Sequence, residues 1–327
     1  MNRSKHTGRA CPLVTRTGLV AAFLATAGVV AVTQSAHADG IVRCWGDRNY
    51  GQCYPPTDLG MCSSVAAGTY NTIALRIDGN VRCWGSNDTT PGDLGTCSAI
   101  AGGGDHTVAI RIDGIVRCWG SNSSGQITPP SDLGPCQKIA AGSEHSVAIR
   151  TDGAVRCWGE NQSGQCNTPV DLGPCHKIAA GSAHSVALRT DGAVRCWGSN
   201  SSGQRTTPTD LGICSSVAAG SQHTIALRTD GTVRCWGKNN YDQSDPPLDL
   251  GPCTSIAGGG YHTIAIQRMP CTGDLNHDNQ VNGADLGVLL GQWATSGGTT
   301  GTDLNLDGTV NGADLGLILG AWGPCPN

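Results

Sequence analysis

The sequence has few aromatic side chains, and one long region of it has no positive charge. Of 327 residues only one is Phe and five are Tyr, which excludes an aromatic-rich core. The 48 Gly instead favour many short strands joined by tight turns. From Cys271 onward there are six Asp and no Lys or Arg. Because neither this region nor the near-neutral body before it is basic, we exclude nucleic acid as a partner.

Long apolar segments are also absent after residue 32, which excludes a transmembrane helix there. The apolar run at residues 19–32 follows four basic residues and precedes the small-x-small pattern Ala36-His37-Ala38. This order is typical of a signal peptide. We therefore predict that residues 1–38 are removed and that the mature chain is secreted to the extracellular space or the cell surface. Loss of the four basic residues changes the net charge from −4 to −8.

What the sequence does have is a repeat. The dipeptide Trp-Gly recurs six times, at intervals of 39, 35, 39, 39 and 39 residues. Its positions are Trp45, Trp84, Trp119, Trp158, Trp197 and Trp236. A fixed period of this length indicates a repeat architecture, in which neighbouring units must stack because one unit cannot bury its apolar face alone.

Each repeat contains the pattern of three short strands. In the third repeat they are predicted at 136–142, 145–150 and 154–159. Val147 and Ile149 alternate with small or polar residues, and Asp152-Gly153 is a pair favoured in two-residue hairpin turns. The second and third strands are therefore predicted to form a hairpin.

The two ends of the array complement each other. Residues 40–46 contain only a third strand, whereas residues 253–266 contain a first and a second strand. Five complete units and one split unit predict an all-β propeller of six short blades over residues 39–270, closed by its N-terminal strand. Closure also protects strand edges that an open array exposes.

The repeat Ile-Ala-Ala-Gly-x-x-His-Ser-Val-Ala-Leu-Arg-x-Asp-Gly-x-Val-x-x-Trp-Gly-x-Asn resembles that of the regulator of chromosome condensation family. The period of 39 and the Gly-Gln after Trp-Gly bring it near the secreted bacterial members of that superfamily, which include the β-lactamase inhibitory protein II. The resemblance covers residues 40–268 and implies the propeller fold. Those relatives have seven blades and lack the paired cysteines of this chain. The fold therefore carries over but a particular partner does not.

The acidic region contains two loops of the same design. Residues 274–285 and 303–314 carry oxygen-bearing side chains at matching loop positions, and a position-7 carbonyl completes each set. The predicted Ca²⁺ ligands are Asp274, Asn276, Asp278, Gln280, Asn282 and Asp285 in the first loop, and Asp303, Asn305, Asp307, Thr309, Asn311 and Asp314 in the second. Because Ca²⁺ takes six to eight oxygens, this spacing predicts two bound ions.

An apolar helical pattern follows each loop, at Leu286, Leu289 and Leu290 and at Leu315, Ile318 and Leu319. This duplicated loop and helix resembles a type I dockerin, so we predict a small α domain at residues 271–327. The resemblance implies docking to a cohesin-like protein. Here Gly-Ala occupies loop positions 10 and 11, where that family usually carries polar specificity residues. Another docking protein is therefore the alternative.

Sixteen cysteines remain after loss of Cys11 with the leader, and an even number in an exported chain predicts disulfides. A first-to-third-strand bridge within one sheet spans about 9.6 Å, beyond the roughly 7 Å that a disulfide tolerates. We use the word excursion for the segment that connects the third strand of one repeat to the first strand of the next. We therefore predict disulfides across these excursions and one disulfide within the tail. The pairs are Cys44–Cys62, Cys83–Cys97, Cys118–Cys136, Cys157–Cys175, Cys196–Cys214, Cys235–Cys253 and Cys271–Cys325. Cys53 and Cys166, three blades apart, are predicted not to pair with each other.

No catalytic constellation stands out. The same position carries His in five repeats, at His106, His145, His184, His223 and His262, and Asn71 in the sixth. A group repeated in every blade indicates a structural role, since catalysis needs it once. Most acidic residues likewise recur in the Asp-Gly and Asp-Leu-Gly turns.

All five tyrosines fall in the first and last repeats, on variable loop positions. They are Tyr50, Tyr54, Tyr70, Tyr241 and Tyr261. With Arg48 and Lys238 beside them, they predict a ligand surface for a protein or a polysaccharide, because Tyr combines a large apolar face with a polar tip. The alternative is that they stabilise the junction where the first and last repeats meet in the closed ring, or that they pack on the tail.

Two functions remain open from the sequence. The favoured one is a secreted, non-catalytic binding protein whose propeller binds a protein or polysaccharide and whose tail docks in a calcium-dependent manner. The second is a polysaccharide-degrading hydrolase, or an accessory component of such a complex, since dockerins usually accompany such enzymes. A pair of carboxylates in one rim pocket would favour the hydrolase.

Overall fold

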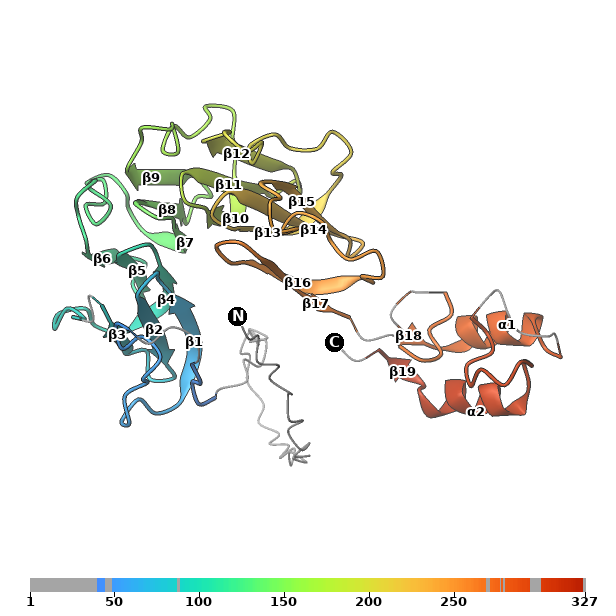
Figure 1. Ribbon diagram of the computed structural model, residues 1–327. Helices are drawn as coiled ribbons and strands as arrows, with labels where there is room; N and C mark the ends of the chain where they lie inside the picture. The colour runs from blue at the N-terminus through green and yellow to red at the C-terminus, as the bar shows by residue number, and fades with distance from the viewer. Residues whose placement is uncertain are drawn as a thin grey trace, which may run out of the picture. The chain divides into compact units, whose positions relative to one another are not determined.

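A computed structural model describes residues 40–44, 49–86, 89–268, 271–276, 278, 280–294 and 301–325. The predicted signal peptide, Trp45 and Arg48 lie outside the described residues. Five three-stranded antiparallel sheets and one two-stranded sheet follow one another over residues 62–267, and we call them blades 1 to 6 (Figure 1). None of the described helices is long and apolar enough to cross a membrane.

The strands of the first three blades are β1 (Cys62–Ala67), β2 (Asn71–Arg76) and β3 (Val81–Gly85); β4 (Cys97–Gly102), β5 (His106–Arg111) and β6 (Val116–Gly120); and β7 (Cys136–Ala141), β8 (His145–Arg150) and β9 (Val155–Gly159). Those of the next three are β10 (Cys175–Ala180), β11 (His184–Arg189) and β12 (Val194–Gly198); β13 (Cys214–Ala219), β14 (His223–Arg228) and β15 (Val233–Gly237); and β16 (Cys253–Gly258) and β17 (Thr263–Gln267).

The hairpin between the second and third strands forms as predicted, but its turn is one residue longer. In blade 3 the N–H of Gly153 donates to the carbonyl of Arg150 (2.9 Å), and the N–H of Arg150 donates to the carbonyl of Ala154 (2.9 Å). The loop therefore has three residues and ends on Gly153 at φ 83°. A type I turn followed by a left-handed residue has this geometry, so glycine is required there. The Asp152 carboxylate accepts from the N–H of Ala154 (2.9 Å) and fixes the turn.

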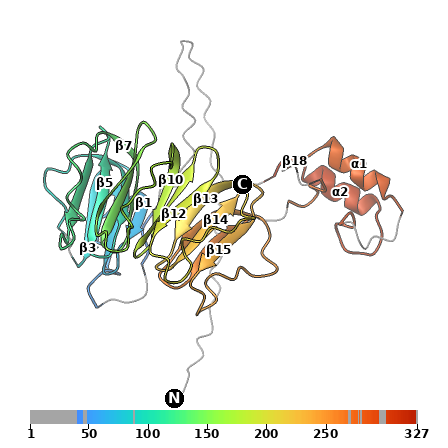
Figure 2. The same cartoon turned by 90° about the horizontal axis from the view of Figure 1, so that it is seen from above.

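The sheets of consecutive blades lie side by side (Figure 2). Side chains of neighbouring blades form an apolar core at each boundary. Between blades 3 and 4 it consists of Val147, Ile149 and Val155 of blade 3, Leu172 of the connecting excursion, and Cys175, Ala187 and Trp197 of blade 4. Trp197 is 4% exposed, and the other described repeat tryptophans are buried in the same way. The alternation of apolar residues in the repeat therefore builds the boundaries between blades.

A backbone hydrogen bond also recurs at these boundaries. The N–H of Cys175 at the start of β10 donates to the carbonyl of Gly153 in the preceding blade (3.0 Å). The same bond joins Cys62 of blade 1 to Gly40, whose N–H in turn donates to the carbonyl of Cys62 (3.1 Å).

Ring closure by the N-terminal strand is not confirmed, because residues 45 and 46 of that strand lie outside the described residues. Among the described residues, β17 pairs only with β16, and no third strand is added to blade 6. The segment 40–44 lies beside blade 1 because both backbone groups of Gly40 are bonded to Cys62.

The acidic region folds into two short helices, each preceded by one of the two acidic loops. They are α1 (Gly283–Gly291) and α2 (Gly312–Gly320), with the short strands β18 (Gln280–Val281) and β19 (Gly323–Pro324) paired antiparallel. Leu289 and Ile318 are completely buried in a common core with Val281 and Val310. Leu290 and Leu319, predicted on the same helix faces, are instead 51% and 56% exposed.

Candidate functional site

The repeated histidines form a belt of hydrogen bonds between blades. The Nε2 atom of His145 lies 3.0 Å from the hydroxyl of Ser185 in the next blade, and that hydroxyl donates to the carbonyl of Gln165 (2.9 Å). Because the hydroxyl proton is used in this way, His145 donates through Nε2–H. His106, His184 and His223 make the same contact with Ser146, Thr224 and Thr263.

Burial sets the charge state of this belt. It lowers the pKa of His106, His145 and His184 to about 4 and also lowers that of His223, so these rings are neutral at pH 7. The four rings are at most 1% exposed. Each of these four buried, neutral imidazoles makes one hydrogen bond to the next blade. This is a structural role, which is the role that the sequence indicates.

The tyrosines lie in two pairs on the surface. The rings of Tyr50 and Tyr70 have centroids 4.5 Å apart, and those of Tyr241 and Tyr261 are 5.6 Å apart with an edge-to-face geometry. All four are exposed, from 38% for Tyr70 to 67% for Tyr241, and Tyr54 is 60% exposed. The same two loop positions touch in blade 3, where Ser124 donates to the Glu144 carboxylate (2.6 Å). The structure therefore pairs Tyr50 with Tyr70 and Tyr241 with Tyr261, whereas the sequence predicts one surface made of all five tyrosines.

Two features next to Tyr261 add to this surface. The ammonium of Lys238 lies 5.9 Å from the centroid of its ring, in cation–π geometry. Tyr241 and His262 also line a cavity of about 370 Å³ between blades 5 and 6. The carboxylates of Asp242 and Asp245 lie in the same lining, so this cavity has the pair of carboxylates that a hydrolase requires.

A second cavity, of about 550 Å³, has walls from all six blades. Its lining comes from the segments that end the first strands, which are Ala-Gly in four blades and glycine runs in blades 2 and 6, together with Thr69, Ser143, Ser182, Ser221 and Tyr261. Backbone hydrogen bonds join these segments from blade to blade, for example from Thr69 to Gly104 (3.0 Å) and from Ser182 to Ser221 (3.0 Å). Our sequence reasoning did not identify this cavity, although the recurring Ala-Gly is its signal.

The recurring acidic residues are used in turns and ion pairs. The Asp191 carboxylate accepts from the Ala193 backbone and from Arg189, and these bonds hold its pKa below the usual range. Asp210 likewise pairs with Arg234 at 2.9 Å. These positions are occupied by structural partners, which agrees with the sequence interpretation.

The cysteines pair differently from the prediction within the propeller. Cys157 forms a disulfide with Cys166, not with Cys175. The other predicted partners, Cys62, Cys97, Cys136, Cys214 and Cys253, carry thiols, so the pairings Cys44–Cys62, Cys83–Cys97, Cys118–Cys136, Cys196–Cys214 and Cys235–Cys253 are not formed. For the five pairs from Cys83–Cys97 onward the physical reason is the topology, because the connection between the two cysteines joins two separate sheets and does not close a hairpin within one. Cys53 and Cys166 are not bonded to each other, as predicted.

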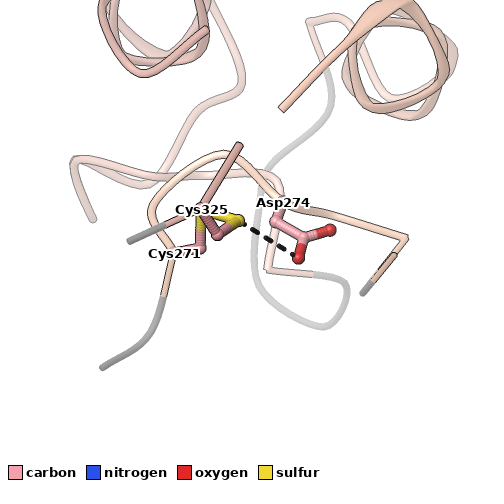
Figure 3. Close-up of side chains that lie close together, drawn as sticks. All are labelled: Cys271, Asp274 and Cys325. Carbon is pink, nitrogen blue, oxygen red and sulfur yellow. Dashed lines mark hydrogen bonds between the residues drawn. A yellow bond between two sulfur atoms is a disulfide. The ribbon is translucent and has the colours of Figure 1, made fainter. Parts of the chain in front are cut away.

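The predicted disulfide of the tail is formed. Cys271 and Cys325 are bonded, with an S–S distance of 2.06 Å (Figure 3). The Cys325 sulfur lies 3.6 Å from the Asp274 carboxylate, at the first position of the first acidic loop (Figure 3).

In both acidic loops the carboxylate at the twelfth position accepts the same three backbone hydrogen bonds. In the first, the buried Asp285 carboxylate accepts from the N–H groups of Leu275 (2.8 Å), Asn276 (3.1 Å) and Asn282 (2.9 Å). Burial opposes ionisation of Asp285, but these N–H groups lower its pKa overall. In the second loop, Asp314 accepts from the equivalent N–H groups.

The first loop also brings charge together. Carboxylate oxygens of Asp274, Asp278 and Asp285 lie within 4.8 Å of one another. Three convergent carboxylates fit a hard divalent cation such as Ca²⁺, which requires oxygen ligands.

Comparison with known proteins identifies the repeat. A family model described as regulator of chromosome condensation (RCC1) repeat matches residues 62–89, 97–126, 136–165, 175–204 and 214–243. None of the curated proteins matches this chain.

Solved structures that are similar to the chain include the following two. Prp20p from Saccharomyces cerevisiae is 19% identical, with a TM-score of 0.58 over 69% of this chain and 78% of that one. The CRINKLY WD40 ectodomain of the Arabidopsis thaliana receptor kinase ACR4 is 27% identical, with a TM-score of 0.54 over 63% and 81%. The chain therefore carries five RCC1 repeats, and its fold is an RCC1-like repeat propeller.

Proposed function

We propose that this chain is a secreted, non-catalytic binding protein whose propeller binds a protein through its tyrosine surface. The observation that carries the proposal is the pair of exposed aromatic contacts, Tyr50 with Tyr70 and Tyr241 with Tyr261. Exposed aromatic groups are enriched at binding hot spots. The fold supports a protein ligand, since the similar Prp20p binds Gsp1p and histones.

A polysaccharide is the second candidate ligand. Tyr faces stack on sugar rings, and the cavity of about 370 Å³ beside Tyr241 offers apolar walls with a few polar groups. A hydrolase is the alternative function, because the carboxylates of Asp242 and Asp245 both line this cavity. We favour the binding protein because the Asp245 carboxylate accepts from the Asn239 amide (2.8 Å) and most of the repeated carboxylates are engaged by backbone and Arg partners.

The experiment compares the full chain with a Tyr50→Ser/Tyr241→Ser variant. Ser occupies these positions in other repeats, so the fold tolerates it. The variant should lose the ligands that the wild-type chain retains on a glycan array or in a pull-down of extracellular proteins, with an unchanged melting temperature. Lowered melting with retained binding would assign the tyrosines to stability instead. Release of a reducing sugar from a bound glycan would replace the proposal with the hydrolase.

For the tail, we propose that its two loops hold two Ca²⁺ ions and that the folded tail docks onto another extracellular component. The convergent carboxylates of the first loop and the matching hydrogen bonds of the second support the metal. Bound Ca²⁺ would neutralise these carboxylates and stabilise the loop. Exposed apolar side chains of the two helices, Leu290 and Leu319, and of the residues that follow them, Trp293 and Trp322, support a docking surface. A cohesin-like protein is one partner of suitable chemistry.

For the ring, we propose that residues 40–46 add the third strand to blade 6. Val42 already packs with Leu59, Cys62, Ala74 and Trp84, a set equivalent to the core between blades 3 and 4. The side chains missing from that set are two aliphatic residues from a second strand.

Blade 6 has two exposed aliphatic side chains that match the two missing from this set. Ile264 and Ile266 of β17 are 51% and 61% exposed, whereas Ile225 and Leu227 at the same positions of blade 5 are 0% and 4% exposed. Pairing in the register of the other blades places Ile264 opposite Cys44 and Ile266 opposite Val42. This would bury both isoleucines against blade 1.

A further inference from the structure

The bonded cysteines Cys157 and Cys166 lie in a ten-residue motif that occurs twice in the chain. Residues 157–166 read Cys-Trp-Gly-Glu-Asn-Gln-Ser-Gly-Gln-Cys, and residues 44–53 read Cys-Trp-Gly-Asp-Arg-Asn-Tyr-Gly-Gln-Cys. In the excursions after Trp119, Trp197 and Trp236, the residue after Gly-Gln or the equivalent Gln is Ile127, Arg205 or Ser244. The two sites therefore share a cysteine that those excursions lack.

The local geometry of the two sites is also the same. The Cys44 sulfur lies 3.0 Å from the Cys53 sulfur and 3.4 Å from the carbonyl oxygen of Gln52. The Cys157 sulfur likewise lies 3.4 Å from the carbonyl oxygen of Gln165, next to its disulfide partner.

The supporting glutamines hold equivalent positions. The Gln52 side chain accepts from the N–H of Tyr50 (2.9 Å), and the Gln165 side chain accepts from the N–H of Ser163 (3.0 Å). The Gln52 carbonyl accepts from the Thr72 hydroxyl (2.9 Å), as that of Gln165 does from the Ser185 hydroxyl (2.9 Å). Each excursion is thus fixed on its blade in the same way, with its two cysteines held together.

Cys62 is the competing partner for Cys44, and its thiol is engaged elsewhere. The Cys62 sulfur lies 3.8 Å from the carbonyl of Gly60, within its own turn. Cys175 lies in the same way 3.5 Å from the carbonyl of Gly173, while Cys157 is bonded to Cys166. The same contact is made by the cysteine that begins the first strand of each other blade, namely Cys97, Cys136, Cys214 and Cys253. Cys62 is therefore held in its own turn, as all of these cysteines are.

We propose that Cys44 and Cys53 form a second disulfide, which fastens the N-terminal segment 40–44 to the excursion of blade 1. In this step both thiols lose their protons, one S–S bond forms, and the two electrons pass to a disulfide donor. The donor's own disulfide is reduced to two thiols, so atoms and electrons balance. The consequence is that the strand proposed to complete blade 6 is covalently held on blade 1. In the cell this inference rests on the proposed export, because disulfides persist in oxidising compartments.

The test maps the disulfides of the full chain after alkylation without reductant. Trypsin followed by cleavage before Asp places Cys53 and Cys62 in different peptides. Cys53 lies in the peptide of residues 49–57, and Cys62 lies in the peptide that begins at Asp58. Linkage of residues 44–46 to residues 49–57 is the expected result, with a mass two hydrogen atoms below that of the two reduced peptides. Linkage of Cys44 to the Cys62 peptide, or a Cys44 fully alkylated while Cys157–Cys166 is bonded, would overturn the inference.

A second arm separates this inference from export. Purified reduced chain is oxidised with a glutathione redox buffer, which requires no secretion. If both disulfides form in vitro but neither forms in cells, export fails and the inference stands.

Variants then test whether the proposed Cys44–Cys53 disulfide stabilises the chain. Cys53→Ser and its matched counterpart Cys166→Ser should each lower the melting temperature of the oxidised chain, by about 5 °C. After reduction, neither variant should differ from the wild-type chain by more than the scatter between scans. If the oxidised Cys53→Ser chain has the same melting temperature as the oxidised wild type, while Cys166→Ser has a lower one, no disulfide is made at Cys44.

Discussion

The backbone N–H of Cys62 donates to the carbonyl of Gly40 at 3.0 Å, and the same bond joins Cys97 to Gly79, Cys136 to Gly114, Cys175 to Gly153, Cys214 to Gly192 and Cys253 to Gly231 at 2.7–3.0 Å. In the last five cases the glycine belongs to the hairpin turn that precedes a third strand. Gly40 thus occupies the place of that turn before blade 1, although no complete blade precedes it in the sequence. This equivalence supports the proposal that residues 40–46 are the third strand of blade 6.

Closure can be tested by placing a charge on β17. Ile264→Asp should destabilise the closed ring by about 3 kcal/mol, because the substitution removes a buried aliphatic group and buries a carboxyl group. Ile115→Asp is the matched control: Ile115 is 50% exposed, against 51% for Ile264, and other blades carry Asn80 or Thr232 at its position. Urea unfolding measures both. Equal losses below about 0.5 kcal/mol would show that β17 remains exposed in solution.

The histidine belt predicts a pH dependence of stability. Because burial lowers the pKa of His106, His145 and His184 to about 4 from the ordinary value of 6.5, the unfolded chain binds more protons than the folded chain between these values. Stability should therefore fall as the pH drops from 6.5 to 4, with a slope that approaches about 1.4 kcal/mol per pH unit for each histidine.

Removing one histidine checks that sign. Compared with the wild-type chain, His145→Asn, which introduces the residue that blade 1 carries as Asn71, should reduce the slope by one proton. Both chains are unfolded with urea at several pH values between 4 and 7. An unchanged slope in His145→Asn would contradict a neutral buried ring.

The repeat made much of this architecture predictable. The period of Trp-Gly, the alternation around Val147 and the Asp-Gly turn predict the three-stranded unit, and the structure forms it in five blades. The recurrence of His145 in its repeats indicates a structural role, and the contact with Ser185 explains it. These features are local or repeated, so the pattern along the chain is sufficient to predict them.

Features that depend on how two sheets meet were not predictable in the same way. Cys118 and Cys136 have a plausible spacing for a disulfide, but they lie on β6 and β7, which belong to different sheets. The Cys157–Cys166 bond follows from the course of the excursion across the blade, which no spacing rule specifies. The cavity shared by all six blades was missed because its lining is mostly glycine and alanine, which carry no chemical motif.

Glycine at the end of the first strand is predicted to be indispensable. A Cβ on Gly142 would overlap the His145 ring and approach the carbonyl oxygen of Gly181 in the next blade to 2.5 Å. Gly142→Ala should therefore cost about 3 kcal/mol, since neither backbone nor a buried ring can move away. Gly92→Ala is the control, because nothing lies within 4 Å of its added Cβ. Similar unfolding midpoints for the two variants would show that the blades have room to separate.

Calcium should bind the tail in two independent sites and contribute to its folding. Titration calorimetry on the full chain is expected to give two ions, and Asp274→Ala and Asp303→Ala should each leave one, because each removes the carboxylate at the first position of one loop. At a free concentration one hundred times the dissociation constant, each ion stabilises the fold by about 2.7 kcal/mol, so a chelator should lower the melting of α1 and α2. Asp105→Asn, at an exposed position of blade 2, removes a similar charge and should still bind two ions. The absence of calcium heat in the wild-type chain, or two ions in either loop variant, would contradict the assignment of the loops.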